Sequence, residues 1–236
     1  MLGGLISYAL LAALAMALVF AAFTDIKRRE IDNWLNLAIA LGAPLYWLAS
    51  GLGWVEIAFQ LGLALATFVV ACVLFATRQM GGGDVKLITA LALWFVPSNF
   101  LQLVVLMAMI GGGASIAMAL FNMKRRPGEA MRDLTALVAA IAWVGFALAV
   151  TFGLATGRPL LGETATRSIA AWLPAGWGLL LVALALSAIL GLGLTHIMRR
   201  QKSRLPIPYG VAIAAAGLLV LTDQHLAAGI LSTTAG

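Results

Sequence analysis

Eight apolar runs follow one another along this chain of 236 residues. They fall roughly at residues 4–23, 35–50, 57–77, 85–96, 100–121, 134–156, 170–195 and 208–232. A helix needs about 20 mostly apolar residues to cross a bilayer, and only short polar segments separate these runs. The pattern predicts an all-α, polytopic transmembrane helix bundle of about eight spans, with residues 1–236 forming a single integral membrane domain.

Composition excludes the other classes of protein. Hydrophobic residues make up 63% of the chain and charged residues only 10%, whereas a soluble domain has about 45–50% and 25%. A disordered chain is also excluded, because such chains are poor in apolar residues. The bilayer lipid is therefore an expected partner of most of the surface.

The basic residues gather in alternate loops. All but Arg158 and Arg167 of the 15 follow the first, third, fifth or seventh run. Short basic loops stay on the cytoplasmic side, so we predict that both termini lie outside. Clusters of this kind are typical of membrane orientation signals, and we expect no nucleic-acid partner despite the net charge of +6.

The fourth run is too short for an ordinary span. About 12 residues separate Asp84 from Pro97, which is near 18 Å of helix at 1.5 Å per residue, against a hydrocarbon core of about 30 Å. If this run did not cross, the basic cluster at 124–126 would lie outside. We therefore expect it to cross and to begin below the cytoplasmic surface, with residues 81–84 in a recess.

Two of the nine acids occupy related positions in this topology. Asp25 ends the first run and Asp84 opens the fourth, both at cytoplasmic ends. Two neighbouring carboxylates resist ionising together and can share one proton, which suits them to activate water and protonate a peptide carbonyl. The simpler alternative is that Asp25 ends a helix beside Lys27 and Arg28 and that Asp84 is a helix N-cap.

Three sequence blocks extend this interpretation. They are TDIKRREIDNWL at residues 24–35, GGGDVKL at 81–87 and LPIPYGVAIA at 205–214. The first two resemble the conserved blocks of bacterial prepilin peptidases, the type IV leader peptidases of the GxGD aspartic class. The third is similar to the closing segment of their short Tad/Flp-pilus branch. The resemblance covers roughly residues 5–122 and 204–220.

The resemblance implies an aspartic endopeptidase of the bacterial inner membrane with Asp25 and Asp84 as its catalytic pair. Its substrate would be a prepilin with a short basic leader, a glycine before the cut and an apolar helix after it. The supporting motif residues would be Gly81, Gly82, Gly83, Lys86, Asn33, Pro208, Tyr209 and Gly210. It implies a catalytic core at 1–122 plus 204–236, with two extra spans within 123–203.

Some features depart from the family pattern. Asp32 stands where the family usually has proline, which makes Asp32 or Glu30 a rival of Asp25. Asp25 is preferred because Asp32 follows three basic residues and is expected to be solvated. The cysteine-paired region linked to N-methylation is absent, so methyl transfer is not implied. The sequence has no zinc-ligand pattern, dinucleotide fingerprint or P-loop, and we expect no metal and no cofactor.

Two other functions remain open at this stage. Asp84 and Asp223 could serve a proton-coupled transporter, although no repeat symmetry is seen. A presenilin-like GxGD protease would share the two acids but cut within the span of its substrate. The Pro-Ala-Leu motif expected of such enzymes is absent. The sequence does not indicate an oligomeric state.

Overall fold

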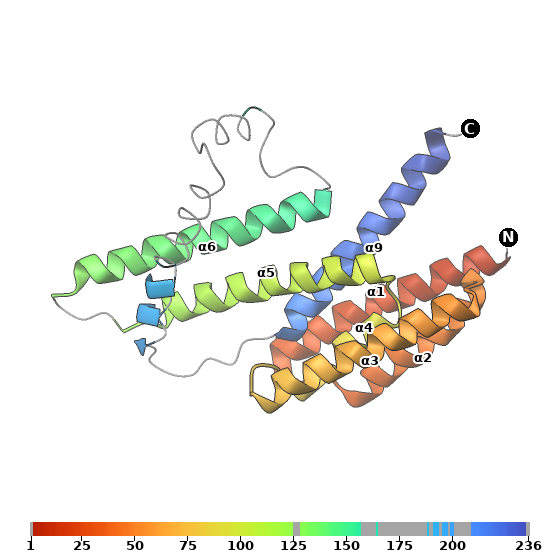
Figure 1. The fold of residues 1–236 in the computed structure, drawn as a ribbon, viewed down its shortest axis with the longest axis horizontal. Helices are drawn as coiled ribbons and strands as arrows, with labels where there is room; N and C mark the ends of the chain where they lie inside the picture. Colours follow the sequence, from red (N-terminus) through yellow and green to blue (C-terminus); the bar gives the residue numbers. More distant parts are fainter. Residues whose placement is uncertain are drawn as a thin grey trace. The chain divides into compact units, whose positions relative to one another are not determined.

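The computed structural model describes residues 2–124, 128–156 and 209–234, with scattered positions between 164 and 200. Every element of this described part is a helix (Figure 1). The all-α prediction is confirmed, while most of the run at 170–195 lies outside the described residues. The helices are α1 (Leu2–Arg28), α2 (Asn33–Ser50), α3 (Trp54–Ala76), α4 (Gly82–Ala92), α5 (Pro97–Phe121), α6 (Ala130–Thr156) and α9 (Tyr209–Thr234).

Four of these helices have the length and apolarity that a membrane span requires. They cover Gly3–Arg28, Trp54–Ala76, Pro97–Phe121 and Ala130–Leu154. Large apolar side chains point away from the protein on their outer faces, as at Trp54, which is 87% exposed. Apolar surface on this scale suits contact with lipid tails. The expected total of about eight spans, and the location of the termini, stay predictions.

The chain divides into two compact units. The first comprises Met1–Gly111 and Pro208–Gly236, and the second comprises Gly112–Ile207, so that α5 contributes to both. In the first unit α1 packs against α2 and α9, while α4 packs against α2, α3 and α9. The prediction of a single membrane domain, with its core at 1–122 and 204–236, stays a prediction.

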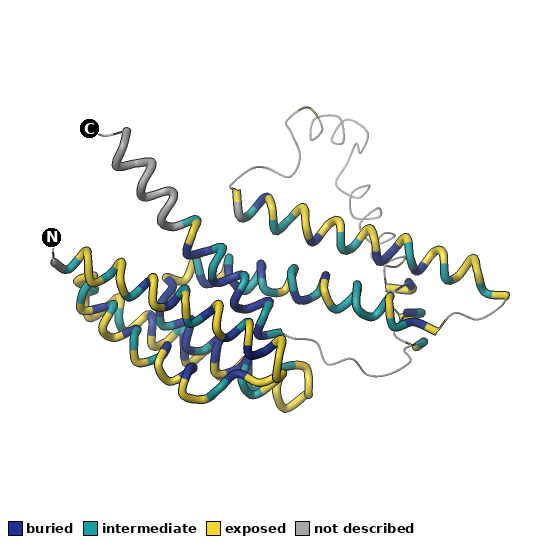
Figure 2. Tube along the Cα trace, turned by 180° about the vertical axis from the view of Figure 1, so that it is seen from behind, coloured by how far each residue is buried: buried dark blue, intermediate teal, exposed yellow. Residues whose placement is uncertain are grey.

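The short helix α4 lies inside the first unit, with neighbouring helices on several sides. Seven of its 11 residues are buried, whereas α1 and α3 are buried along only about a fifth of their spans (22% and 17%). Figure 2 shows this contrast, since the buried positions gather on the inner faces of the bundle and exposed positions cover its outside. The sequence prediction of a short fourth helix is thus confirmed in length, while its crossing of the membrane and the recess at residues 81–84 stay predictions.

Two tryptophans fix the end of α4 to α2. The Trp94 indole N–H donates to the carbonyl of Ile39 at 2.8 Å, and the Trp47 indole N–H donates to the carbonyl of Leu93 at 2.8 Å. The Trp94 ring fills the space beside Gly42, where a Cβ would lie only 2.8 Å from the ring. These reciprocal bonds satisfy both indole donors inside an apolar bundle and hold α4 in place.

The second unit has a small core of its own. Met123, Ala136, Ala140 and Ile197 are buried together, and apolar residues of α5 pack against them. The Lys124 N–H donates to the carbonyl of Arg200 at 2.8 Å and joins two segments that are distant in sequence.

Candidate active site

Asp25 lies in the last turns of α1 and points into the first unit. The residue is only 6% exposed. Its Oδ2 accepts a hydrogen bond from the Val211 N–H at 3.1 Å. Val211 is the third residue of α9, and the first N–H groups of a helix have no partner within that helix. The start of α9 thus donates to a buried carboxylate 186 positions away in the sequence, and Asp25 does not act as a simple helix end.

Gly210 makes this approach possible. A Cβ at this position would lie 2.8 Å from the Asp25 Oδ2 and 2.7 Å from the Ile31 Cδ1. Real Cβ atoms essentially never come so close to other atoms. Any side chain at Gly210 would therefore displace the carboxylate or the isoleucine.

Asp84 lies in the first turn of α4 and is 8% exposed. Its Oδ2 accepts the N–H of Gly81 at 3.2 Å, while Gly81 itself is the N-cap residue. Asp84 is therefore not the N-cap that the simpler alternative expected. It holds the third position of the helix, from which its carboxylate reaches back over the glycine turn.

The fold brings the two acids together. Asp25 lies near enough to Asp84 for the two charges to act on each other. Ile31 contacts the glycines next to both acids. A Cβ on Gly83 would lie 3.2 Å from the Ile31 Cβ, and a Cβ on Gly210 would lie 2.7 Å from the Ile31 Cδ1. Among the acids of the described part, only Asp25 and Asp84 are buried. A close pair of buried carboxylates can share a proton and act as acid and base.

The remaining acids near the pair lie differently. Asp32 forms an ion pair with Arg28 at 3.1 Å, and its side chain is 31% exposed. Glu30 is exposed. Neither is buried, so the geometry favours Asp25 over both rivals.

The motif lysine and asparagine contact each other. The Lys86 Nζ donates to the Asn33 Oδ1 at 2.7 Å, and both residues are exposed. This bond joins α4 to the first residue of α2, beside the buried pair.

The other predicted supporting residues lie around the two acids. Gly82 is open enough that a Cβ would meet Phe75 at an ordinary 3.5 Å. Tyr209 packs on Gly111, where a Cβ would lie 3.3 Å from the tyrosine ring. Pro208 lies outside the described residues.

Two residues at the site were not singled out from the sequence. The first is Ile31, which lies against Gly83 and Gly210. Asn36 is 4% exposed, and its Nδ2 donates to the Gly83 carbonyl at 3.4 Å, while its Oδ1 has no hydrogen-bond partner. Asn36 could have been found from the sequence, because it is a polar residue just inside the apolar run at 35–50. Nothing in the sequence marked Ile31.

No metal site accompanies the pair in the described residues. Within them, no three side chains of histidine, cysteine, aspartate or glutamate come together in a group that could hold an ion. The groups that this site offers for chemistry are the two carboxylates and the backbone N–H donors that hold them.

Comparison with known proteins agrees with this geometry. Residues 12–117 match the model of the type IV leader peptidase family. Over these residues, which are less than half of the chain, the sequence is similar to that family. No curated protein and no solved structure matches the chain.

The leader peptidase match includes both acids. It spans most of α1 to α5, including Asp25, Asp84 and the glycine turn between α3 and α4. It ends before α9, whose first turn supplies the N–H that Asp25 accepts. The match is to a family of peptidases, and the long apolar helices of the chain suggest a membrane protein.

Proposed function

We propose that this protein is a prepilin leader peptidase, an aspartic endopeptidase in which Asp25 and Asp84 form the catalytic pair. The observation that carries the proposal is the meeting of two buried carboxylates, from α1 and α4, within the part of the chain that matches the family. Burial of acids is costly and is typical of functional sites in membrane proteins.

The proposed chemistry uses one proton shared by the pair. The ionised carboxylate accepts a proton from water, and the water oxygen attacks the carbonyl carbon of the scissile peptide. The protonated carboxyl gives its proton to the carbonyl oxygen, which forms a gem-diol. When the gem-diol collapses, the C–N bond breaks and the leaving nitrogen takes the proton that the first carboxylate had accepted from water. A hydroxyl of the gem-diol returns its proton to the other carboxylate as the new carboxyl group forms. The pair then holds one proton again.

The hydrogen bonds at the site would keep the reacting oxygens in place. Each carboxylate has one oxygen, Oδ2, bonded to a backbone N–H of a different segment, Val211 for Asp25 and Gly81 for Asp84. The Asp25 carboxylate is also held by the backbone N–H of Gly210. A carboxylate has about four acceptor positions, so both groups would keep some for water or for the partner acid. A site held by backbone donors loses little energy to rearrangement during the reaction.

The proposed substrate is a prepilin with a short basic leader, a glycine before the cut and an apolar helix after it. The helix would lie in the bilayer beside the apolar faces of the protein, and the leader would stay on the cytoplasmic side of the inner membrane. Because the leader and the enzyme loops are both basic, helix packing would contribute more to recognition than charge. The Tad/Flp branch is proposed from the block at 205–214.

The experiment is co-expression of the full chain with a Flp-type prepilin in a strain without its own leader peptidase, followed by mass spectrometry of the pilin. The proposal predicts loss of the leader with a new N-terminus directly after the glycine. A cut within the apolar helix would instead favour a presenilin-like protease. An intact prepilin would contradict both proteolytic functions.

A further inference from the structure

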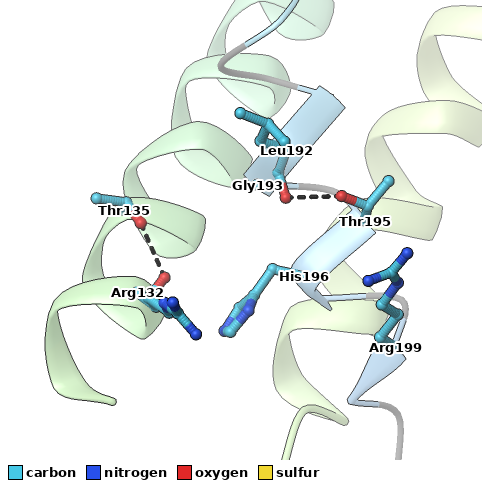
Figure 3. Close-up of a pocket in the computed structure, with 7 residues that line it drawn as sticks. All are labelled: Arg132, Thr135, Leu192, Gly193, Thr195, His196 and Arg199. Atoms are coloured by element: carbon cyan, nitrogen blue, oxygen red, sulfur yellow. Dashed lines mark hydrogen bonds between the residues drawn. The ribbon is translucent and has the colours of Figure 1, made fainter.

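A cavity of about 450 Å³ lies in the second unit (Figure 3). Three of its described lining residues carry or can carry positive charge, and none of the described ones is acidic. The lining residues are Arg132, Thr135, Leu192, Gly193, Thr195, His196 and Arg199. In Figure 3 the side chains of Arg132 and His196 point toward each other from α6 and from the segment at 191–200. Nothing in the proposed proteolysis uses this cavity.

The acids near this cavity already have partners. Glu129 forms an ion pair with Arg200, and Asp133 bonds the Nε2 of His196 at 3.0 Å. In the described part of the chain, neither Arg132 nor Arg199 forms an ion pair with an acid. The charge of Glu129 also acts on Arg132 and His196. Two acids, Glu129 and Asp133, thus face three arginines, Arg132, Arg199 and Arg200, and the lining keeps a net positive charge.

The two threonines are not the groups that would hold an anion. The Thr135 hydroxyl donates to the carbonyl of Arg132 at 2.9 Å, and the Thr195 hydroxyl donates to the carbonyl of Leu192 at 2.9 Å. Both hydroxyl protons are therefore already donated to backbone carbonyls and do not bind an anion. The donors left for a ligand are the guanidinium groups, whose planar shape matches the oxygens of a phosphate.

The place of the cavity on α6 indicates the source of such a phosphate. Arg132 and Thr135 lie in the first turns of the candidate span Ala130–Leu154, within about 8 Å of its start at 1.5 Å per residue. That is the depth of lipid headgroups. Leu192 at the rim is 72% exposed and offers an apolar surface to an acyl chain. Basic pockets at the ends of membrane helices are known to take anionic headgroups.

We propose that this cavity binds a phosphate group, supplied by the headgroup of an anionic phospholipid and held by Arg132 and Arg199. The site is independent of the proposed catalytic pair, because all of its lining residues belong to the second unit. Lipid bound there would anchor the start of α6 to the segment at 191–200.

The test is native mass spectrometry of the full chain titrated with phosphatidylglycerol or phosphatidylcholine. The wild type is expected to bind phosphatidylglycerol more tightly. Arg132→Gln and Arg199→Gln are each expected to weaken that binding about fivefold and to leave phosphatidylcholine binding unchanged. Arg78→Gln is the matched control, because it removes an exposed basic residue of the first unit.

A second arm separates the two sources of phosphate. Inorganic phosphate is titrated into the protein in phosphatidylcholine nanodiscs and followed by calorimetry. Weak binding of phosphate beside tight binding of phosphatidylglycerol supports the lipid. Tight, Arg132-dependent binding of inorganic phosphate would overturn the lipid assignment. The whole proposal fails if the wild type binds both lipids equally, or if Arg78→Gln weakens phosphatidylglycerol binding as much as the cavity variants do. Because the lipid preference is measured on the wild type, misfolding of a variant would not leave the proposal untested.

Discussion

The two units of the molecule hold their least exposed acidic side chains in different ways. In the first unit Asp25 and Asp84 are buried, lie close to each other and accept hydrogen bonds from backbone N–H groups. In the second unit Glu129 and Asp133 are half-buried and bond the side chains of Arg200 and His196. An acid beside a cation is neutralised, whereas two acids held by N–H groups keep a proton and a charge available for a reaction. Under the proposed function, the first arrangement is reactive and the second is structural.

The largest difference should appear when the carboxyl of one acid in each unit is replaced by an amide. Asp84→Asn keeps the size and the acceptor oxygen of the side chain but cannot take or give the proton, so leader cleavage should fall by about 1,000-fold or more. Asp133→Asn, the matched change in the second unit, should leave the cleavage rate within a few fold of the wild type. Both rates are measured on a purified prepilin in detergent. Equal losses in the two variants would end the distinction between the units.

The next effect concerns the glycine under Asp25. Gly210→Ala would place a methyl group where its carbon lies 2.8 Å from the Asp25 Oδ2, and the resulting shift should reduce cleavage about 100-fold. Gly62→Ala, in α3, is the control because nothing lies within 4 Å of its Cβ position. Normal cleavage by Gly210→Ala would show that the position of Asp25 is not critical.

A smaller loss is expected at the buried amide beside the glycine turn. Asn36→Leu removes the donor to the Gly83 carbonyl, and a lost hydrogen bond of about 1.5 kcal/mol corresponds to roughly a tenfold lower kcat. Gln60→Leu changes the other buried amide of the first unit, whose Oε1 also lacks a partner, and should keep kcat near the wild-type value. If both variants lose kcat equally, Asn36 serves general packing and does not position the turn.

The smallest effect is a pH dependence in the second unit. The hydrogen bond from Arg200 holds the pKa of Glu129 below its ordinary value of 4.5. A carboxyl with a lowered folded-state pKa stabilises the fold above the unfolded value and loses that contribution as pH falls through the folded value. Arg200→Gln should therefore lower the thermal midpoint slightly at neutral pH, and the difference from the wild type should shrink below pH 4.5. A difference that stays constant with pH would assign the effect to packing.

Much of the first unit could be predicted from the sequence because its signals are local. Apolar runs marked the helices within a few residues, and the short run after Asp84 predicted the short helix α4. The scarcity of acids drew attention to Asp25 and Asp84. The resemblance to leader peptidases added the supporting motif residues, among them Gly81 and Gly210.

Contacts between distant segments could not be predicted in this way. No local pattern indicates that the N–H of Val211 bonds Asp25, or that Ile31 fits between Gly83 and Gly210. The N-cap expectation for Asp84 was wrong by one helical turn, because a glycine turn allows more than one start for the helix. The cavity of the second unit was also missed, since its basic residues were interpreted only as orientation signals.

The central claim is that Asp25 and Asp84 act as one catalytic unit, and a double-mutant cycle tests it most directly. Leader cleavage is measured for Asp25→Asn, Asp84→Asn and the variant with both changes. When two residues act as one unit, removing one of them abolishes the function of both. The double variant should therefore cleave as slowly as either single variant and no slower. Losses that multiply in the double variant, or full processing by either single variant, would contradict the account.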